Sequence, residues 1–445
     1  MKIHLIAIGG SAMHNMALAL HHKGFHITGS DDAIFSPSKE RLAKYNLLPN
    51  KIGWDPSKIT SDLDAIILGM HAREDNPELK KARKLSIPIF SYPEYIYEQS
   101  KNKKRIVIGG SHGKTSITAM ILHVLENLNI DCDFMVGAQL EGFDTMVKLT
   151  HDAPIIILEG DEYLSSPIDR RPKFHLYQPD IAVISGISWD HVNVFPTFDI
   201  YVNQFRIFKN MVKEALIYCS EDEELNKLAK ENTKCKLIAY STPKHTIKEG
   251  ITSLEDTELL IFGNHNLQNL NAAKLVCNEI GVSDKDFYKK ISTFKGASNR
   301  LELVKSTETS AIYKDFAHSP SKLKATSAAM KKQFSNRKLV ACMELHTFSS
   351  LNEKFLKQYK RSMNEPDTAI IYFNPKAIAH KNLEAITKEQ VHNAFGREDL
   401  LVFTDSTKLE KHLKMLNWKN QNLLMMSSGN FNKIDFNTLN ITHFS

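Results

Sequence analysis

The segment RIVIGGSHGKTSITAMIL, residues 105–122, decides how this chain folds. Three apolar β-forming residues run into two glycines, then Ser-His-Gly-Lys-Thr, and then a pattern typical of a helix. Backbone N–H groups at a helix start carry the positive end of the helix dipole, and glycines let the main chain approach phosphate oxygens closely. The segment therefore predicts a strand, a phosphate-binding loop and a helix.

Two residues of this loop have the chemistry of a nucleotide phosphate site. Lys114 can reach the β- and γ-phosphates, and Thr115 can place its hydroxyl on Mg²⁺. The loop departs from the full phosphate-loop pattern because Ile108 occupies the place of the first glycine. A plain glycine turn before a surface helix is the alternative, but it leaves Gly-Lys-Thr at a strand–helix turn unexplained.

Acidic residues follow two further apolar runs. ILEGDEY, residues 157–163, puts Glu159 and Glu162 just past a predicted buried strand, and SWDHVNVF, residues 188–195, puts Asp190 and His191 past the next one. In α/β proteins the carboxyl ends of parallel strands form the ligand edge, and carboxylates beside a triphosphate can hold Mg²⁺. One such acidic loop is more often a cap or surface feature, but three sites ending successive strands indicate an active site.

The rest of the chain predicts an α/β fold in three blocks. Residues 1–102 alternate strand and helix at the spacing of a Rossmann-like parallel sheet, and KNKKR, residues 101–105, has the charge of a linker. Residues 103–297 carry the phosphate loop and continuous apolar runs, among them LLIF at residues 259–262. Such runs are typical of strands in a mostly parallel sheet buried on both faces. Residues 298–445 show a second Rossmann-like alternation, in which NEKFLKQYKRSM, residues 352–363, is expected to be helical.

Composition excludes several classes of protein. The net charge of +6 is mild and spread along the chain, so we expect no nucleic-acid partner. No apolar run approaches membrane-spanning length, and MKIHLIAIGG is too short in apolar residues for a signal peptide, so we expect no membrane partner. The five cysteines are scattered without a CxxC pair, as reduced thiols of a cytoplasmic protein are.

Together and in this order, seven motifs resemble those of the Mur ligases, the ATP-dependent amide-forming enzymes of peptidoglycan synthesis. The motifs are GGSAM, GGSHGKT, EGDE, the DH of WDHVN, GNHNLQNLNAA, the arginine of GASNR, and KDFAHSP. The resemblance covers nearly the whole chain. It implies that ATP phosphorylates the carboxylate of a UDP-muramic acid compound and that an amine then attacks the acyl phosphate, with Mg²⁺ as the metal cofactor.

The resemblance assigns roles residue by residue. It implies that Lys114, His191 and Arg300 are catalytic and that Thr115, Glu159 and His191 bind metal. It implies that the ATP-binding residues are Gly110, Ser111, His112, Gly113, Lys114, Thr115, Ser116, His265, Asn266, Asn269, Arg300, Asp315 and His318. The asparagine after His265 would contact adenine, although it can equally be a helix N-cap.

The first block resembles the family's UDP-binding domain. The residues implied to bind the UDP-sugar are Gly9, Gly10, Ser11, Ala12, Met13, Asp31, His71 and Arg73. Two glycines and an acid also loosely match a dinucleotide fingerprint, but its third glycine is missing, because Ala12 and Met13 follow Ser11.

The branch of the family is predicted from positions at which this chain departs from the family's motifs. Some branches carry a carbamoylated lysine about fifteen residues past the DH motif, where this chain has Gln204 and Phe205. The branch without it contains the UDP-N-acetylmuramate–L-alanine ligases and the murein peptide ligases, which attach L-Ala-γ-D-Glu-meso-diaminopimelate. The basic pair Arg170-Arg171 resembles the peptide ligases and could pair with tripeptide carboxylates, so we expect the tripeptide as substrate and L-alanine as the alternative.

The third block contributes to the amine site. ELHTFSSLNEKF, residues 344–355, keeps His346 but has Thr347 where the alanine ligases carry arginine. The expected amine-substrate residues are therefore Arg170, Arg171 and His346, in a monomer or weak homodimer. A folylpolyglutamate-type ligase lacks a GGSAM-type first block, and a non-catalytic nucleotide-binding protein would have lost residues such as Lys114.

Overall fold

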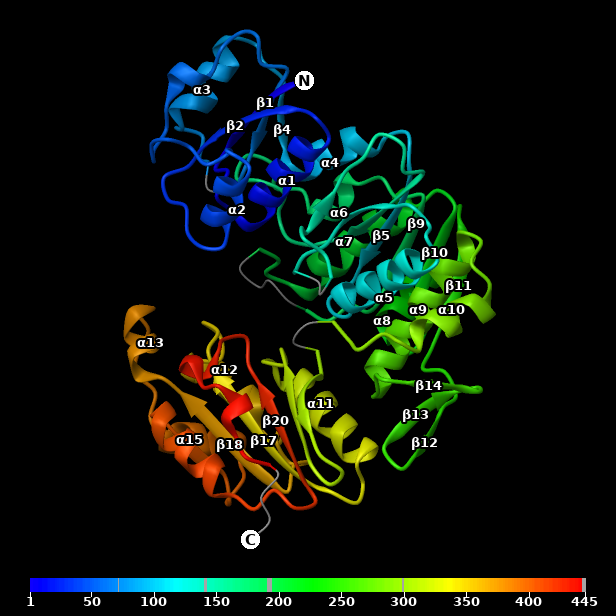
Figure 1. Ribbon diagram of the computed structural model, residues 1–445, viewed down its shortest axis with the longest axis vertical. Helices are drawn as coiled ribbons and strands as arrows, with labels where there is room; N and C mark the ends of the chain where they lie inside the picture. Colours follow the sequence, from blue (N-terminus) through cyan, green and yellow to red (C-terminus); the bar gives the residue numbers. More distant parts are fainter. Residues whose placement is uncertain (71, 140–141, 190–193, 298–299, 442–445) are drawn as a thin grey trace. The chain divides into compact units, whose positions relative to one another are not determined.

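A computed structural model describes residues 1–70, 72–139, 142–189, 194–297 and 300–441 (Figure 1). The chain forms two compact units. The first unit contains Met1–Thr242 and Gln268–Ile291, and the second contains Pro243–Leu267 and Ser292–Ser445. The second unit therefore takes residues 243–267 from the predicted middle block. The predicted boundaries near 102 and 297 stay a prediction.

The first sheet of the first unit is parallel, in the order β2-β1-β3-β4. Its strands are β1 (Lys2–Ile6), β2 (His26–Ser30), β3 (Ala65–Leu68) and β4 (Ile89–Ser91). Its helices are α1 (Ser11–His22), α2 (Ser38–Lys44), α3 (Pro77–Lys84) and α4 (Tyr92–Ser100), with the 3-10 turn η1 (Pro56–Lys58). Helix α1 begins directly after the predicted diphosphate turn.

The second sheet of this unit has the order β11-β10-β9-β5-β8-β6-β7, and only β7 runs antiparallel. Its strands are β5 (Lys104–Gly109), β6 (Asp133–Met135), β7 (Val147–Lys148), β8 (Ile155–Glu159), β9 (Ile181–Ile184), β10 (Ala215–Cys219) and β11 (Lys236–Tyr240). Its helices are α5 (Lys114–Asn127), α6 (Lys173–Leu176), α7 (Phe198–Met211), α8 (Glu223–Lys230), α9 (Asn264–Glu279) and α10 (Asp284–Ile291). The start of α9, up to Leu267, belongs to the second unit.

The order of this sheet places a topological switch point at β5. Strand β8 lies on one side of β5, and the next strand in the chain, β9, lies on the other. Open α/β sheets bind ligands outside the carboxyl ends of the strands at such a point. The loop that follows β5 is therefore at the position where this architecture puts a ligand.

The second unit contains two sheets. A small antiparallel one joins β12 (Thr246–Lys248), β13 (Ile251–Leu254) and β14 (Thr257–Leu259). The larger one has the order β15-β16-β20-β17-β18-β19 and is parallel except for β15. Its strands are β15 (Glu302–Ser306), β16 (Ala311–Asp315), β17 (Lys338–Leu345), β18 (Thr368–Phe373), β19 (Leu401–Phe403) and β20 (Gln421–Met426).

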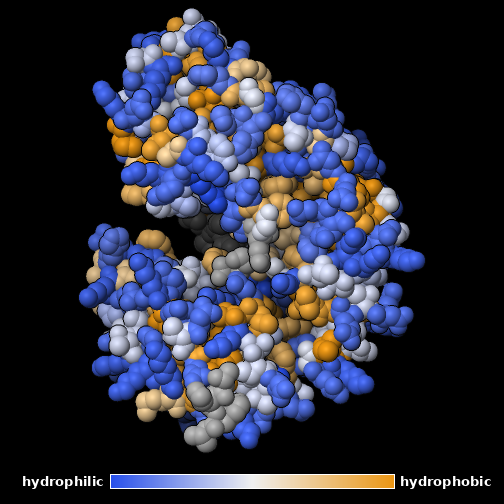
Figure 2. Space-filling model, in the orientation of Figure 1, coloured by the Kyte–Doolittle hydropathy of each residue, from blue (hydrophilic) through white to orange (hydrophobic). Residues whose placement is uncertain are grey.

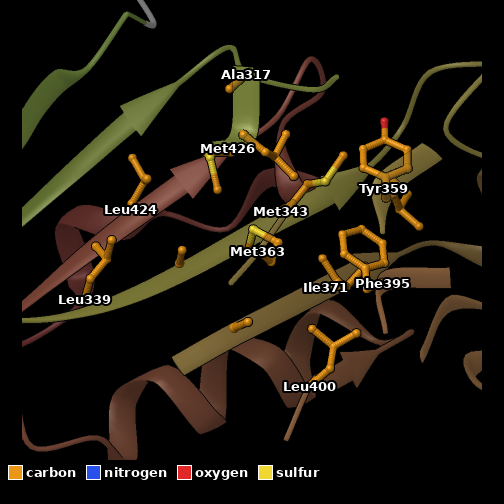
Figure 3. Close-up of a cluster of buried hydrophobic side chains, with 14 of the residues drawn as sticks. Ala317, Leu339, Met343, Tyr359, Met363, Ile371, Phe395, Leu400, Leu424 and Met426 are labelled. Atoms are coloured by element: carbon orange, nitrogen blue, oxygen red, sulfur yellow. The ribbon is translucent and has the colours of Figure 1, made fainter. Parts of the chain in front are cut away.

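Helices cover both faces of the larger sheet. They are α11 (Pro320–Gln333), α12 (Glu353–Leu356), α13 (Pro375–His380), α14 (Lys388–Phe395) and α15 (Ser406–Met415), with the 3-10 turns η2 (Lys357–Tyr359), η3 (Phe431–Lys433) and η4 (Phe436–Thr438). One apolar cluster fills each face. In the cluster of Figure 3, Tyr359 stacks on Phe395 at 5.2 Å between ring centroids, and its hydroxyl points away from that ring.

The predicted α/β class is confirmed, but two predicted elements are wrong. Residues 352–363 form only the short α12 and η2, because Arg361 adopts a positive φ of 61° and its N–H donates to the carbonyl of Phe395. The run LLIF, residues 259–262, contributes only Leu259 to a strand, since Phe262 packs edge-on against Tyr313 at 5.5 Å instead.

Candidate nucleotide site and active site

The phosphate loop has the backbone of an anion cradle. Strand β5 is buried and ends at Gly109, and α5 begins at Lys114. Gly110 and Gly113 have positive φ angles of 127° and 78°. A Cβ on Gly110 would overlap Ser185 Oγ, and a Cβ on Gly113 would overlap Asn269 Oδ1. The loop therefore requires glycine at both places, and the predicted site residue Asn269 lies against it.

The lysine of the loop is held by an acid from the neighbouring strand end. Lys114 Nζ lies 2.7 Å from Glu162 Oε2 and 2.7 Å from the carbonyl oxygen of Gly110. Burial disfavours the charged ammonium, but the charges of Glu162 and Asp161 outweigh it and raise the pKa of Lys114. The lysine is a fixed cation at neutral pH. The sequence pointed to Glu162 as a possible metal ligand, whereas the structure makes it the partner of Lys114.

Thr115 and Glu159, two residues expected to bind Mg²⁺, have side-chain oxygens next to each other. Thr115 Oγ1 donates to Glu159 Oε1 at 2.9 Å, and the N–H of Gly137 donates to Glu159 Oε2 at 2.8 Å. A hydroxyl and a carboxylate oxygen at this spacing fit the preference of Mg²⁺ for a few protein oxygens. Among the described residues no group of three His, Cys, Asp or Glu side chains gathers at metal-binding distance. Asp190 and His191 lie outside the described residues.

Sequence reasoning missed a tyrosine at this site. Tyr201 of α7 is fully buried, and its hydroxyl lies 3.1 Å from Glu162 Oε1 and 2.8 Å from Ser111 Oγ. Tyr201 stands 90 residues from Ser111 along the chain, and no motif surrounds it. Its position ten residues past Asp190-His191 was the only local signal.

Other loop residues contact the strand ends beside them. His112 offers its carbonyl oxygen to Ser185 Oγ, and Ser116 is buried in the first turn of α5. Asp161 accepts an ion pair from Lys173 at 2.5 Å. Burial opposes the charged form of Asp161, but Lys173 and Lys114 lower its pKa below the ordinary value.

The basic pair predicted to read the tripeptide is only partly free. Arg171 makes an ion pair with Asp169 at 2.6 Å and with Glu94 of the first sheet's α4 at 3.1 Å. The hydrogen bonds to Asp169 raise the pKa of Arg171, and Arg171 lowers that of Asp169 against the effect of burial. The guanidinium of Arg171 is thus occupied within the chain, while Arg170 is exposed.

The predicted UDP segment forms the turn between β1 and α1. Gly10 is the N-cap of this twelve-residue helix, Ser11 and Ala12 are exposed at its start, and Met13 is buried. The N–H of Gly9 donates to Asp31 Oδ2 at 2.6 Å. Burial and the neighbouring Asp32 raise the pKa of Asp31, despite that N–H. Asp31 therefore supports the turn from the end of β2.

One of the two remaining predicted UDP contacts, Arg73, lies on the loop after β3. Arg73 is exposed there, as a residue that meets a ligand from solution would be. His71 lies outside the described residues.

Four other predicted ATP contacts are brought together in the second unit. Asp315, at the end of β16, accepts N–H donors from Leu301 at 2.8 Å and from Ala317 at 2.7 Å. The guanidinium of Arg300 lies 4.7 Å from the ring centre of Phe316. His318 Nδ1 pairs with the carbonyl oxygen of Phe316 at 2.7 Å.

The histidine of the GNHN motif belongs to the same group. Burial lowers the pKa of His265, with the charge of Asp315 opposing the shift and that of Arg300 adding to it. His265 is therefore neutral at neutral pH. Asn266, at the start of α9, donates to the carbonyl of Phe262 at 3.0 Å, which ties the helix start to the preceding segment.

The amine residue predicted in the second unit lies past the end of β17. His346 is about a third exposed, and its Nδ1 lies 3.8 Å from the buried Glu344. Glu344 also accepts from the N–H of Phe431 at 2.8 Å. Lys381 donates to the carbonyl oxygen of His346 at 2.7 Å and lies 4.7 Å from the ring centre of the exposed Phe348. The structure thus gathers polar and aromatic groups at this strand end.

The surface agrees with a protein whose apolar groups are mostly inside. Hydrophilic side chains cover most of the face shown in Figure 2, with apolar ones scattered among them. None of the helices in the described part of the chain is long and apolar enough to cross a membrane. All five cysteines are free, and four of them are buried.

Comparison with known proteins gives the family. Residues 2–104 match the family model "Mur ligase family, catalytic domain", and residues 108–277 match "Mur ligase middle domain". The UDP-N-acetylmuramate–L-alanine ligase of Caldicellulosiruptor bescii is 30% identical over 417 residues, which cover 88% of this chain and 87% of that protein.

Two solved structures have a similar fold. The UDP-N-acetylmuramate-alanine ligase of Thermotoga maritima has a TM-score of 0.69 at 20% identity, and the murein peptide ligase of Psychrobacter arcticus has a TM-score of 0.63 at 22% identity. Each alignment covers 97% of this chain and 96% of the other. These two structures show the fold, and the family models and the 30% identical relative show the family. The chain belongs to the Mur ligase family, the ATP-dependent ligases of peptidoglycan synthesis that form amide bonds.

Proposed function

We propose that this protein joins L-alanine to the carboxylate of UDP-N-acetylmuramate in the cytoplasm, through an acyl phosphate made from ATP. The observation that carries the proposal is the pairing at the switch point of the second sheet. There Lys114 lies 2.7 Å from Glu162, and Thr115 lies 2.9 Å from Glu159. A phosphate-binding cation and two metal-binding oxygens are thus side by side where the fold places a ligand.

The chemistry requires positive charge between two anions. A carboxylate oxygen of the sugar attacks the γ-phosphorus of ATP, and ADP leaves. The amine nitrogen then attacks the acyl carbon, inorganic phosphate leaves with the former carboxylate oxygen, and the amine gives up a proton. Lys114 reduces the repulsion between carboxylate and phosphate in the first step, and bound Mg²⁺ adds charge neutralisation there.

The second unit supplies further groups in this proposal. Arg300 contacts the phosphates, Asp315 and His318 contact the nucleotide, and Asn266 contacts adenine. Asp315 is fixed by the N–H groups of Leu301 and Ala317, so its oxygens hold a defined position. His191 takes the second metal position.

The nature of the amine rests on the curated relatives and on the basic loop. Relatives that span most of this chain are UDP-N-acetylmuramate–L-alanine ligases, which supports L-alanine over our expectation of a tripeptide. The loop supports the same choice, because Arg171 is already paired with Asp169 and Glu94. A guanidinium that already pairs with two carboxylates has fewer N–H donors left for a third carboxylate.

The tripeptide is the second candidate for the amine substrate, and two observations favour it. Thr347 stands where the alanine ligases carry arginine, so a standard alanine pocket is incomplete. Arg170 is exposed beside the paired Arg171. If the tripeptide is the amine, Arg170→Ala should raise its KM by about tenfold, since one charge-assisted pair is lost, and should leave the KM for ATP unchanged.

The test is phosphate release with ATP, Mg²⁺ and UDP-N-acetylmuramate, with L-alanine or with L-Ala-γ-D-Glu-meso-diaminopimelate. Stimulation by L-alanine, with UDP-N-acetylmuramoyl-L-alanine as the product, is the expected result. Stimulation by the tripeptide alone would replace L-alanine by the second candidate and leave the ATP site standing. Release that needs neither amine nor UDP-sugar would contradict both.

A further inference from the structure

A chain of hydrogen bonds crosses the phosphate loop through one buried hydroxyl. The N–H of Ser188, just after β9, donates to Ser111 Oγ at 2.8 Å. Ser111 Oγ lies 2.8 Å from the hydroxyl of Tyr201, which lies 3.1 Å from Glu162 Oε1. The other oxygen of Glu162 accepts from Lys114 at 2.7 Å. The segment that follows a central strand is thus connected to the loop lysine.

The donor and acceptor of each hydrogen bond in this network follow from the groups at its two ends. The charged carboxylate of Glu162 can only accept, so Tyr201 donates to it. The oxygen of Tyr201 then accepts the proton of Ser111, whose own oxygen is taken by the N–H of Ser188. All donors point toward Glu162, and Lys114 donates from the other side. This network of hydrogen bonds therefore stabilises the negative charge of Glu162.

The ring of Tyr201 is held in place by its neighbours. It is fully buried and lies 5.4 Å from the ring of Phe195 and 5.2 Å from that of Phe205, between centroids. Helix α7, which carries Tyr201, is capped by Thr197. The hydroxyl cannot follow Glu162 if that carboxylate moves, so it defines where the carboxylate stays.

We propose that Tyr201 is a positioning residue for the phosphate-loop lysine. This inference rests on the proposed ATP site. When phosphates draw Lys114 away, the buried Glu162 loses its counter-charge, and the Tyr201 hydroxyl continues to stabilise the carboxylate. Tyr201 thereby lowers the free energy needed to release the lysine to the nucleotide. It also holds Ser111 within the loop.

The test variant is Tyr201→Phe, which keeps the ring and removes only the hydroxyl. A charged group that loses one donor in a buried site corresponds to a change on the order of tenfold. We expect the Kd of a fluorescent ADP analogue and the KM for ATP to rise by about that factor. The KM for UDP-N-acetylmuramate should stay within twofold, and kcat should change less than the KM for ATP.

Tyr177→Phe is the matched control. The hydroxyl of Tyr177 is also buried in the same unit, but it has no hydrogen-bond partner within the described part of the chain. This variant should bind the ADP analogue like the wild type. Nucleotide affinity of Tyr201→Phe within twofold of Tyr177→Phe would overturn the inference.

A double variant separates positioning from a general packing effect. If Tyr201 acts through the charge of Glu162, its substitution should have little further effect on nucleotide affinity in a Glu162→Gln background. Additive effects would overturn the inference. The proposed ATP site is tested separately, because wild-type protein that binds no ADP analogue, or Lys114→Ala that binds it unchanged, would refute that site whatever Tyr201→Phe does.

Discussion

At Lys114 two requirements meet in one side chain. A buried ammonium needs a counter-charge, and a phosphate-binding lysine needs freedom to turn toward its ligand. The pair with Glu162 meets the first requirement, since it raises the pKa of the lysine against the effect of burial. In the proposed function, nucleotide phosphates compete with Glu162 for Lys114, and the strength of this pair then sets how readily the loop accepts ATP.

Lys114→Ala should lower kcat by about 10²–10³-fold, since a preorganised cation is lost where charge develops. It should also lower the melting temperature, because the side chain of Glu162, only 2% exposed, loses its cation. Steady-state kinetics and thermal melting measure the two effects. UDP-sugar binding should be retained.

Two further variants control this prediction. Glu162→Gln added to Lys114→Ala should recover stability but no activity. Arg206→Ala, which breaks a half-exposed surface pair with Glu231, should change stability by less than about 1 kcal/mol and activity hardly at all. Ligase activity retained in Lys114→Ala would remove Lys114 from the reaction.

At the scale of elements, the turn between β5 and α5 combines strand order with glycine chemistry. Strand β5 lies between β8 and β9, so its carboxyl end is flanked by the segments that carry Glu159 and Ser185. The turn must bring its backbone close to Ser185 after β9 and to Asn269 of α9, and only glycine permits this at Gly110 and Gly113. The site is therefore a property of the three strand ends together.

Gly113→Ala should abolish nucleotide binding. Its φ of 78° is strained for alanine, by about 1–2 kcal/mol, and the new Cβ would overlap Asn269 Oδ1. Gly24→Ala is the control, because Gly24 has a φ of 88° with open space around its Cβ position. It should lose a similar amount of stability and keep full nucleotide affinity, measured by titration with an ADP analogue. An equal loss of nucleotide affinity in both variants would contradict the prediction that the backbone of this loop binds the phosphates.

The sequence predicts those parts of the site that are local. Gly-Lys-Thr after an apolar run predicts the loop, and the acids after the next strands predict the ligand edge. Tyr201 could not be predicted, because it meets Glu162 across 39 residues and comes from a helix face that looks like ordinary core. The pairing of Arg171 with Glu94 spans 77 residues and could not be predicted either, although it occupies one arginine of the predicted basic pair. Contacts that form only when distant segments pack together leave no local pattern in the sequence.

Both units contain histidines that are buried or partly buried. His14 and His175 are buried and His123 is partly buried in the first unit, and His265 is partly buried in the second. Burial is the largest cause of a lowered pKa in each, relative to the ordinary 6.5. Below about pH 6.5 the unfolded chain binds protons that the folded chain does not. Acid therefore weakens the whole fold.

The melting temperature should fall as the pH is lowered from 7.5 to 5.5. Each such histidine contributes up to about 1.4 kcal/mol per pH unit, in the direction that favours unfolding at low pH. Thermal unfolding at several pH values measures the slope. His175→Gln, which removes one buried imidazole that pairs with the carbonyl of Gln204, should make the slope shallower. A melting temperature that is constant or rises toward pH 5.5 would show that these histidines do not set the acid sensitivity of the fold.

In the proposed reaction, ATP activates the sugar carboxylate as an acyl phosphate. The direct measurement uses UDP-N-acetylmuramate labelled with ¹⁸O in its carboxylate, with ATP, Mg²⁺ and L-alanine, and mass spectrometry of the phosphate released. We expect one ¹⁸O in each phosphate formed together with an amide bond, because the carboxylate oxygen leaves with the phosphorus. Amide formation with unlabelled phosphate would contradict it.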